Sequence, residues 1–259
     1  MLLKDKVAVV YGAGNVGGAV AKAFAADGAR VFLASRTAEK LAKVSAGAKA
    51  AGSSIETAVL DVLDADAVRR HLDGVVAAAG RVDISFNAMS FRGDLQGRWL
   101  RDMPVADFLT PIEVASRGQF ITATAAARQM ITQRSGSIVM LSTTAAGLSG
   151  RDRSGFHQTG GFGVACAAIE ELARGLAGEL GPYGVRVNCV RSDAISEVWP
   201  PEHEAEWRPA INWMQDATAL KRLPRLAEVA GAVTFAASDR ASAMTGALLN
   251  LSCGSQMFA

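Results

Sequence analysis

Three glycines near the start of the chain have the spacing of a phosphate-binding loop. Gly12, Gly14 and Gly17 form the pattern G-x-G-x-x-G between a short apolar run and a stretch with helical periodicity. In such a loop the first glycine permits a tight turn, the second lets the backbone approach a pyrophosphate, and the third allows close packing of helix and strand. The N–H groups of the following helix face the phosphate, so Asn15 and Val16 are further expected contacts. We therefore predict a dinucleotide site; the alternative is a glycine turn with a purely structural role.

The end of the next apolar run indicates which dinucleotide binds. Ser35 and Arg36 stand where sites selective for NAD carry an acidic residue that binds the ribose 2′-hydroxyl. A guanidinium pairs with a 2′-phosphate, whereas a carboxylate would repel it. The nearest acid, Glu39, lies a helical turn further on. The pattern favours NADP(H); the alternative is a solvated Arg36 at the start of the next helix.

These residues need a scaffold in which strands and helices alternate. Short apolar runs of strand length occupy residues 7–10, 31–34, 55–60, 82–86, 138–141, 185–190 and 248–251. Amphipathic stretches begin near Val16, Ala38, Ala65, Val105, Gly161 and Arg225. Strands joined by helices of crossover length give a parallel sheet covered on both faces. We predict an α/β fold of the Rossmann type, a doubly wound parallel sheet forming a single domain over residues 1–259.

One segment interrupts the alternation after the sixth apolar run. Residues 192–219 contain two adjacent prolines and Trp199, Trp207 and Trp213. Long insertions in compact domains are usually functional or disordered, and disordered segments are poor in aromatic residues. We expect a lid over a small apolar or aromatic substrate. The alternative is a helical ornament that packs on its own core.

Composition narrows the class of protein further. The net charge of +2 among 259 residues gives no electrostatic reason to expect nucleic acid or an anionic membrane as partner. No apolar run approaches the ~20 residues of a membrane span. The three cysteines, Cys166, Cys189 and Cys253, are widely spaced and suggest neither a metal site nor a disulfide framework. We expect a cytoplasmic protein with reduced thiols and no bound metal.

The later part of the chain carries a long helical stretch and then a strand. Residues 162–166 read F-G-V-A-C, residues 172–177 read L-A-R-G-L-A, and residues 181–188 read G-P-Y-G-V-R-V-N. This region resembles the catalytic helix and following strand of the short-chain dehydrogenase/reductase family. The resemblance puts Phe162, Cys166 and Ala115 at the positions of the family's Tyr, Lys and Asn. Thr143 or Thr144 stands where the family has its catalytic Ser.

Further segments resemble the same family, and the likeness covers nearly the whole chain. It implies cofactor contacts along the edge of the sheet, in addition to the glycine loop. The residues concerned are Asp61, Val62, Asn87, Ala88, Met89 and Ile195. After the sixth strand, Ser192 and Asp193 replace the family's Pro-Gly pair.

The missing Tyr and Lys raise the question of which group supplies a proton. Phe162 has no proton to give, and Cys166 is a weak donor without positive charge. His157 is the only histidine near this helix, and an imidazole is a natural acid near neutral pH. The alternative is that His157 is an ordinary surface residue.

Three functions therefore compete. The first is an NADP(H)-dependent oxidoreductase with non-standard catalytic residues, acting on a small apolar or aromatic carbonyl, alkene or alcohol compound. The second is a catalytically inactive NADP(H)-binding module, a sensor or partner subunit. The third is a lyase that lost the nucleotide, which the intact glycine loop and Arg36 disfavour. The resemblance also implies a homo-oligomer, either a tetramer or a dimer.

Overall fold

The computed structural model, which describes residues 1–148, 158–199 and 201–257, contains a seven-stranded parallel sheet. The strand order is β3-β2-β1-β4-β5-β6-β7. The strands are β1 (Val7–Tyr11), β2 (Arg30–Ser35), β3 (Ile55–Val59), β4 (Ile84–Asn87), β5 (Gly136–Thr143), β6 (Val185–Ser192) and β7 (Leu248–Leu251). Each coincides with one of the predicted apolar runs to within a few residues at its ends.

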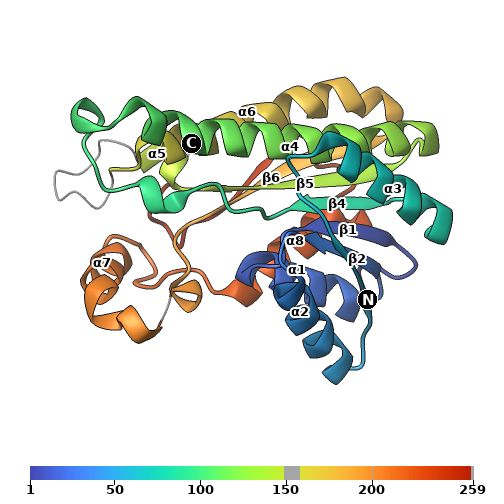
Figure 1. Cartoon of the computed structure of the whole chain (residues 1–259), viewed down its shortest axis with the longest axis horizontal. Helices are drawn as coiled ribbons and strands as arrows, with labels where there is room; N and C mark the ends of the chain where they lie inside the picture. Colours follow the sequence, from blue (N-terminus) through green and yellow to red (C-terminus); the bar gives the residue numbers. More distant parts are fainter. Residues whose placement is uncertain (149–157, 200, 258–259) are drawn as a thin grey trace.

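Helices cover both faces of this sheet (Figure 1). One face carries α1 (Asn15–Ala26), α2 (Ala38–Ala50) and α8 (Leu226–Ala237); the other carries α3 (Ala65–Ala79), α4 (Val105–Gln133) and α6 (Gly160–Leu180). Each face buries its own apolar core. The single-domain, doubly wound α/β fold predicted from the sequence is therefore confirmed.

Small residues let the two long helices of the second face approach closely. An added side chain at Gly161 of α6 would meet the carbonyl oxygen of Phe108 in α4 at 1.8 Å. Glycine at this point therefore brings the start of α6 against α4. This contact sets the position of the first turns of α6 along α4, next to the carboxyl ends of the strands.

The segment after β6, expected to be a lid or a helical ornament, contains one α-helix. After two short 3-10 turns it forms α7 (Glu204–Asp216), which lies beyond the ends of the strands (Figure 1). Pro209 sits inside α7, where a proline usually signals a helix end. A shorter helix, α5 (Ala145–Leu148), follows β5 directly.

The strand order reverses between β1 and β4, and crevices that hold ligands form at such a point, outside the carboxyl ends of the strands. The glycine loop follows β1 at this edge, and Thr143 and Ser192 end β5 and β6 as a paired register position. None of the helices in the described ranges is both long and apolar enough to cross a membrane.

Candidate active site

The glycine loop has the backbone geometry that its sequence predicts. Gly12 has a φ of +102°, in the region that favours glycine. A Cβ atom at Gly17 would lie 1.8 Å from the carbonyl oxygen of Gly12, so any side chain here would break the contact between helix and loop. A Cβ atom at Gly14 would meet nothing within 4 Å. The backbone at Gly14 is thus open to a ligand at the N-terminus of α1.

A cavity extends from this loop to the ends of β2, β3 and β4. Of the residues expected to hold a cofactor, those lining it are Gly12, Gly14, Ser35, Arg36, Asp61, Val62, Ala88 and Met89. Lys40, from the first turns of α2, also lines it and was not predicted. The sequence offers a signal for it, because Lys40 falls in the first turn of the helix that begins just after Arg36.

The charged side chains of this first cavity, called the nucleotide cavity below, face solvent. The Arg36 side chain is 70% exposed, and its nearest carboxylate is that of Asp61, with Nη1 and Oδ2 3.9 Å apart. Asp61 also accepts a hydrogen bond from the backbone N–H of Leu63 at 3.0 Å. A guanidinium held so loosely can turn to an incoming phosphate at small cost.

The other predicted cofactor residues do not all face this cavity. The side-chain amide of Asn87 donates to Thr122 Oγ1 at 2.9 Å and to the Gly118 carbonyl at 3.2 Å, and so ties β4 to α4. Asn15 and Gly17 support the loop without lining either cavity described here. Val16 and Ile195 line the second cavity instead.

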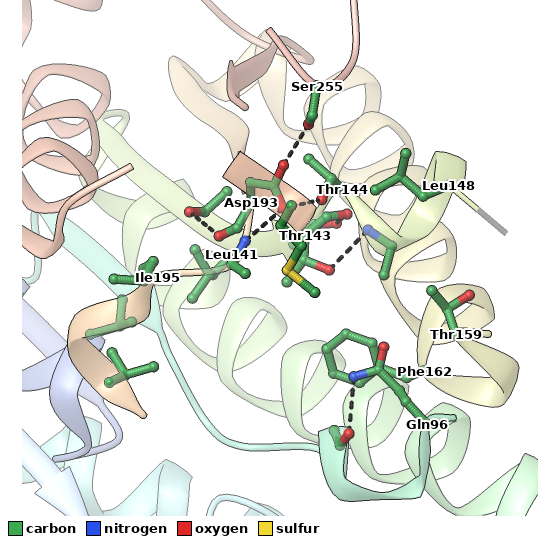
Figure 2. A pocket seen from close by; sticks show the side chains of 18 of the residues that line it. Gln96, Leu141, Thr143, Thr144, Leu148, Thr159, Phe162, Asp193, Ile195 and Ser255 are labelled. Carbon is green, nitrogen blue, oxygen red and sulfur yellow. Dashed lines mark hydrogen bonds between the residues drawn. The ribbon is translucent and has the colours of Figure 1, made fainter. Parts of the chain in front are cut away.

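That second cavity, of about 520 Å³, opens beside the carboxyl ends of β5 and β6 (Figure 2). Most of its described lining is apolar, including Leu141, Leu148, Phe162, Ile195, Val198 and Met214. Val16 belongs to its wall, so this cavity lies next to the glycine loop. The arrangement suits a substrate placed against the inner end of a bound dinucleotide.

Helix α6 presents an aromatic ring and a thiol where the family resemblance would place Tyr and Lys. Phe162 lines the second cavity and stacks on Phe91, with ring centroids 4.8 Å apart. Cys166 is fully buried, and its Sγ lies 3.3 Å from Thr143 Oγ1. Burial raises the pKa of the Cys166 thiol, so it stays protonated near neutral pH. Ala115 is buried in α4 and does not line the cavity.

The two threonines at the end of β5 both line the second cavity but differ in their contacts. The Thr143 hydroxyl accepts from the backbone N–H of Ala145 at 3.2 Å. The Thr144 hydroxyl donates to Asp193 Oδ1 at 3.1 Å. His157 lies outside the described residues, so its predicted role has no structural counterpart here.

Asp193 is the only charged side chain among the described residues that line the second cavity. It directly follows β6 and is 8% exposed. Besides Thr144, its carboxylate accepts from the backbone N–H of Ala194 at 2.7 Å and from Ser255 Oγ at 2.5 Å. Figure 2 shows Asp193 between Thr144 and Ser255, with Phe162 on the other side of the view. The sequence marked Asp193 only as a departure from the family's Pro-Gly pair.

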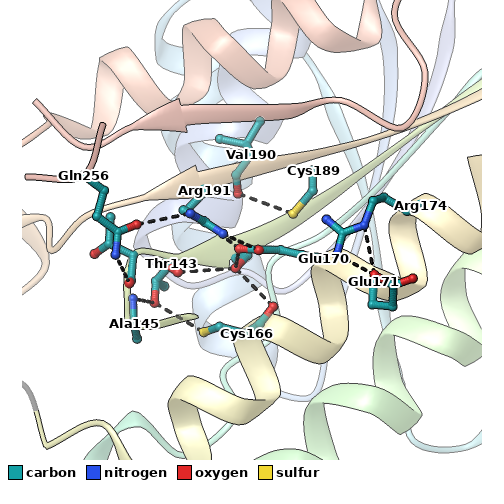
Figure 3. Close-up of polar contacts among 12 residues, drawn as sticks. Thr143, Ala145, Cys166, Glu170, Glu171, Arg174, Cys189, Val190, Arg191 and Gln256 are labelled. Atoms are coloured by element: carbon teal, nitrogen blue, oxygen red, sulfur yellow. Dashed lines mark hydrogen bonds and ion pairs between the residues drawn. The ribbon is translucent and has the colours of Figure 1, made fainter. Parts of the chain in front are cut away.

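Behind the threonines lies a buried ion pair that sequence reasoning missed. Glu170, on the same face of α6 as Phe162 and Cys166, accepts from Arg191 Nε of β6 at 2.7 Å and from Ser142 Oγ at 2.7 Å (Figure 3). Arg191 Nη1 in turn donates to Gln256 Oε1 at 3.1 Å. The two charged side chains are 7% and 5% exposed. The pair joins α6, β6 and the C-terminal segment beneath the cavity.

The segment after β6 contributes to the cavity wall through Val198, Trp199, Met214 and Ala217. The Trp199 ring packs edge to face on Trp207, with centroids 5.5 Å apart. Of the three tryptophans expected over the substrate, only Trp199 lines the cavity.

The residues present fit a nicotinamide dinucleotide. An open glycine cradle, cations beside β2 and an adjoining apolar cavity match its pyrophosphate, its adenosine ribose and its nicotinamide end in that order. Across the described part of the chain, no group of three or more His, Cys, Asp or Glu side chains could hold a metal ion.

Comparisons with known proteins agree with this geometry. Residues 12–256 match the family model described as enoyl-(acyl carrier protein) reductase. Galactitol 2-dehydrogenase of Rhizobium johnstonii is 33% identical over 257 residues, which cover 97% of this chain and 95% of that protein. Secoisolariciresinol dehydrogenase of Forsythia intermedia is 31% identical, over 94% of this chain and 86% of that protein.

Solved structures of related sequence have the same fold as this chain. The crystal structure of NAD+-bound xylitol dehydrogenase superposes with a TM-score of 0.85 at 28% identity, covering 97% of this chain and 99% of the other. Levodione reductase superposes with the same TM-score of 0.85 at 26% identity, covering 97% of each chain.

Proposed function

Since this chain belongs to the short-chain dehydrogenase/reductase family, whose relatives are oxidoreductases, we propose that it is an NADP(H)-dependent oxidoreductase with non-standard catalytic residues. Its substrate would be a small apolar or aromatic carbonyl, alkene or alcohol compound. The apolar lining of the second cavity supports this substrate class.

The observation that carries the nucleotide preference is the pair of cations at the end of β2. Arg36 and Lys40 line the nucleotide cavity together with Ser35. The solved xylitol dehydrogenase holds NAD+, so the family relationship alone does not select the phosphorylated cofactor. A 2′-phosphate between two cations gains charge-assisted hydrogen bonds that a 2′-hydroxyl does not.

The non-standard part of the proposal rests on the second cavity. Bound NADP(H) would supply the hydride chemistry, while the protein must orient the substrate and manage a proton. Thr143 and Thr144 offer hydroxyls at the cavity wall, and a hydroxyl can hydrogen-bond a substrate oxygen. Phe162 and Cys166 offer neither an acid nor a cation. His157 remains a proposed donor.

The lack of a proton donor in the described wall of the second cavity favours the alternative, an NADP(H)-binding module without catalysis. Among the described residues that line the second cavity there is no Tyr, Lys or His side chain. A sensor or partner subunit would keep the nucleotide cavity and need no proton donor. Turnover of any substrate with NADPH would exclude this alternative.

We also infer a homo-oligomer, a dimer or tetramer, formed through α4 and α6. Each of these helices exposes a large apolar side chain, Phe120 at 55% and Val164 at 45%. Exposed apolar side chains on long, Ala-rich helices suit a helix–helix interface between copies. Sedimentation or light scattering would test this inference.

The test of the nucleotide preference is a fluorescence titration with NADPH and NADH. We expect NADPH to bind more tightly, and Arg36→Ala and Lys40→Ala each to lower its affinity by about 1–3 kcal/mol without affecting NADH. Lys43→Ala, which alters an exposed α2 lysine outside the cavity, is the matched control. Equal affinity for both nucleotides, or unchanged NADPH binding in both variants, would contradict the proposal.

A further inference from the structure

The charge of the second cavity carries an inference about its substrate. Its described wall holds one ionisable side chain, Asp193, among apolar groups and two aromatic rings, Phe162 and Trp199. The carboxylate accepts three hydrogen bonds, from Thr144, from the backbone N–H of Ala194 and from Ser255. The cavity therefore presents a buried carboxylate without a cationic side chain in its described wall.

The hydrogen bonding of Asp193 leaves room for a ligand. A carboxylate has about four acceptor positions. Oδ1 accepts from Thr144 and from the backbone N–H of Ala194, whereas Oδ2 accepts from Ser255 alone. One acceptor position at Oδ2 is thus filled by no described residue, and either a cation or a hydrogen-bond donor on a ligand can occupy it.

A cationic ligand satisfies these features better than a neutral one. A buried charge is costly unless it is paired. A cation beside the Asp193 carboxylate would supply that pairing, and aromatic faces such as those of Phe162 and Trp199 also attract cations. A neutral ketone would leave the carboxylate with its three hydrogen bonds but without an opposite charge.

We propose that this site takes a protonated imine, an iminium ion, as its hydride acceptor; this substrate class rests on the oxidoreductase function proposed above and takes the place of the neutral substrates named there. An iminium already carries its proton, so the reaction needs none of the acid that Phe162 and Cys166 fail to provide. The iminium carbon accepts hydride from the reduced nicotinamide, which is oxidised. The C=N π pair becomes the nitrogen lone pair, and the neutral amine takes a proton from water after release.

Within this proposal Asp193 binds the positive nitrogen and holds it on one wall of the cavity. As hydride arrives the cation is neutralised, so the attraction to Asp193 weakens and favours product release. Thr144 and Ser255 orient the carboxylate. Their hydroxyls donate to it and leave the remaining position of Oδ2 to the substrate.

The first test is binding without cofactor, measured by calorimetry. The probe is N-methyl-3,4-dihydroisoquinolinium, whose charge is permanent, and the neutral comparison is 1-tetralone, a ketone of similar size. We expect wild type to bind the cation about 10- to 100-fold more tightly than the ketone, and Asp193→Asn to remove this difference. Asn keeps the shape of Asp and can still accept from Thr144. If Asp193→Asn fails to fold, the wild-type comparison still decides, because equal affinities for the two probes would overturn the cation site.

The second test is turnover with NADPH. We expect oxidation of NADPH with 3,4-dihydroisoquinoline or its N-methyl cation and little with 1-tetralone. Reduction of the ketone but not of the iminium would overturn the proposal, as would Asp193-dependent binding without any turnover of a loaded NADPH complex. Failure of NADPH to bind, while the cation still binds through Asp193, would instead overturn the oxidoreductase function and retain the cation site.

Discussion

The nucleotide cavity and the second cavity, which lie on two halves of the same sheet edge, differ in how far their charged side chains are exposed and paired. Around the nucleotide cavity, Arg36 is mostly exposed and only loosely paired with Asp61. Around the second cavity, Glu170 and Arg191 are buried and bound to each other, while Asp193 is held by three donors. The first half offers its cations to a ligand, whereas the second uses most of its charges to hold β6 and α6 together. Chemistry can therefore change in the second half while the fold and nucleotide cavity persist.

The largest effect is expected from breaking the buried pair. Glu170→Ala leaves the Arg191 guanidinium buried without its carboxylate, which should lower the free energy of unfolding by about 3–5 kcal/mol. Glu56→Ala removes the partner of Arg30 in an exposed ion pair at the amino ends of β2 and β3, and should cost at most about 1 kcal/mol. Chemical denaturation measures both variants.

Replacing both charged residues of the buried pair tests whether the unpaired charge causes the loss of stability. The double variant Glu170→Leu with Arg191→Met should recover most of the lost stability, because no unpaired charge remains. Similar losses for Glu170→Ala and Glu56→Ala would contradict the distinction between the buried and the exposed ion pair.

The next effect concerns the glycine loop. Gly17→Ala forces a methyl group against the Gly12 carbonyl oxygen, which should lower stability by about 1–3 kcal/mol and abolish most NADPH binding. The control is Gly74→Ala in α3, where an added Cβ meets nothing within 4 Å. That variant should gain about 0.5–1 kcal/mol from reduced backbone freedom and keep NADPH affinity. Full NADPH binding by Gly17→Ala would remove the loop from the nucleotide site.

The smallest effect is a difference in thiol reactivity. Burial raises the pKa of the Cys166 and Cys189 thiols, and a protonated thiol is a poor nucleophile. Burial raises the pKa of the Cys253 thiol as well, but Cys253 is only partly buried and is therefore the most accessible of the three. In native protein a thiol reagent should modify Cys253 first, and Cys166 and Cys189 should react only in denaturant. Mass spectrometry locates the label, and native labelling of Cys166 as fast as Cys253 would show that Cys166 is accessible from the cavity.

Sequence reasoning succeeded where local pattern decides structure. Each strand is a short apolar run, and Gly12, Gly14 and Gly17 are required by local backbone geometry. It missed features that arise only when distant segments meet. The contact of Glu170 with Arg191 depends on how α6 packs on β6, and the placement of Asp193 beside Ser255 depends on the C-terminal segment. The residue pattern within one segment does not indicate which residue of a distant segment it will contact.

The segment after β6 shows the same limit. Pro209 lies inside helix α7, although a proline usually ends a helix, so the sequence of this segment is not typical of a continuous helix. Tryptophan content suggested three rings over the substrate, whereas Trp199 lines the cavity and Trp207 packs behind it. Composition indicates that aromatic residues are needed, but packing decides which of them face the cavity.

We propose that this chain keeps the nucleotide cavity and lacks the usual proton donor of its family. The most direct measurement compares NADPH oxidation with small aromatic ketones in wild type and in Phe162→Tyr with Cys166→Lys. The two positions lie one helical turn apart on the same face of α6, and Tyr alone would keep a pKa near ~10, so Phe162→Tyr is the control.

General acid catalysis contributes about 100- to 10,000-fold, and Asp193 beside the cavity limits the gain, so we expect the double variant to be at least about 10-fold faster than wild type and than Phe162→Tyr. A double variant that folds, binds NADPH and reduces no ketone faster than wild type would contradict the claim.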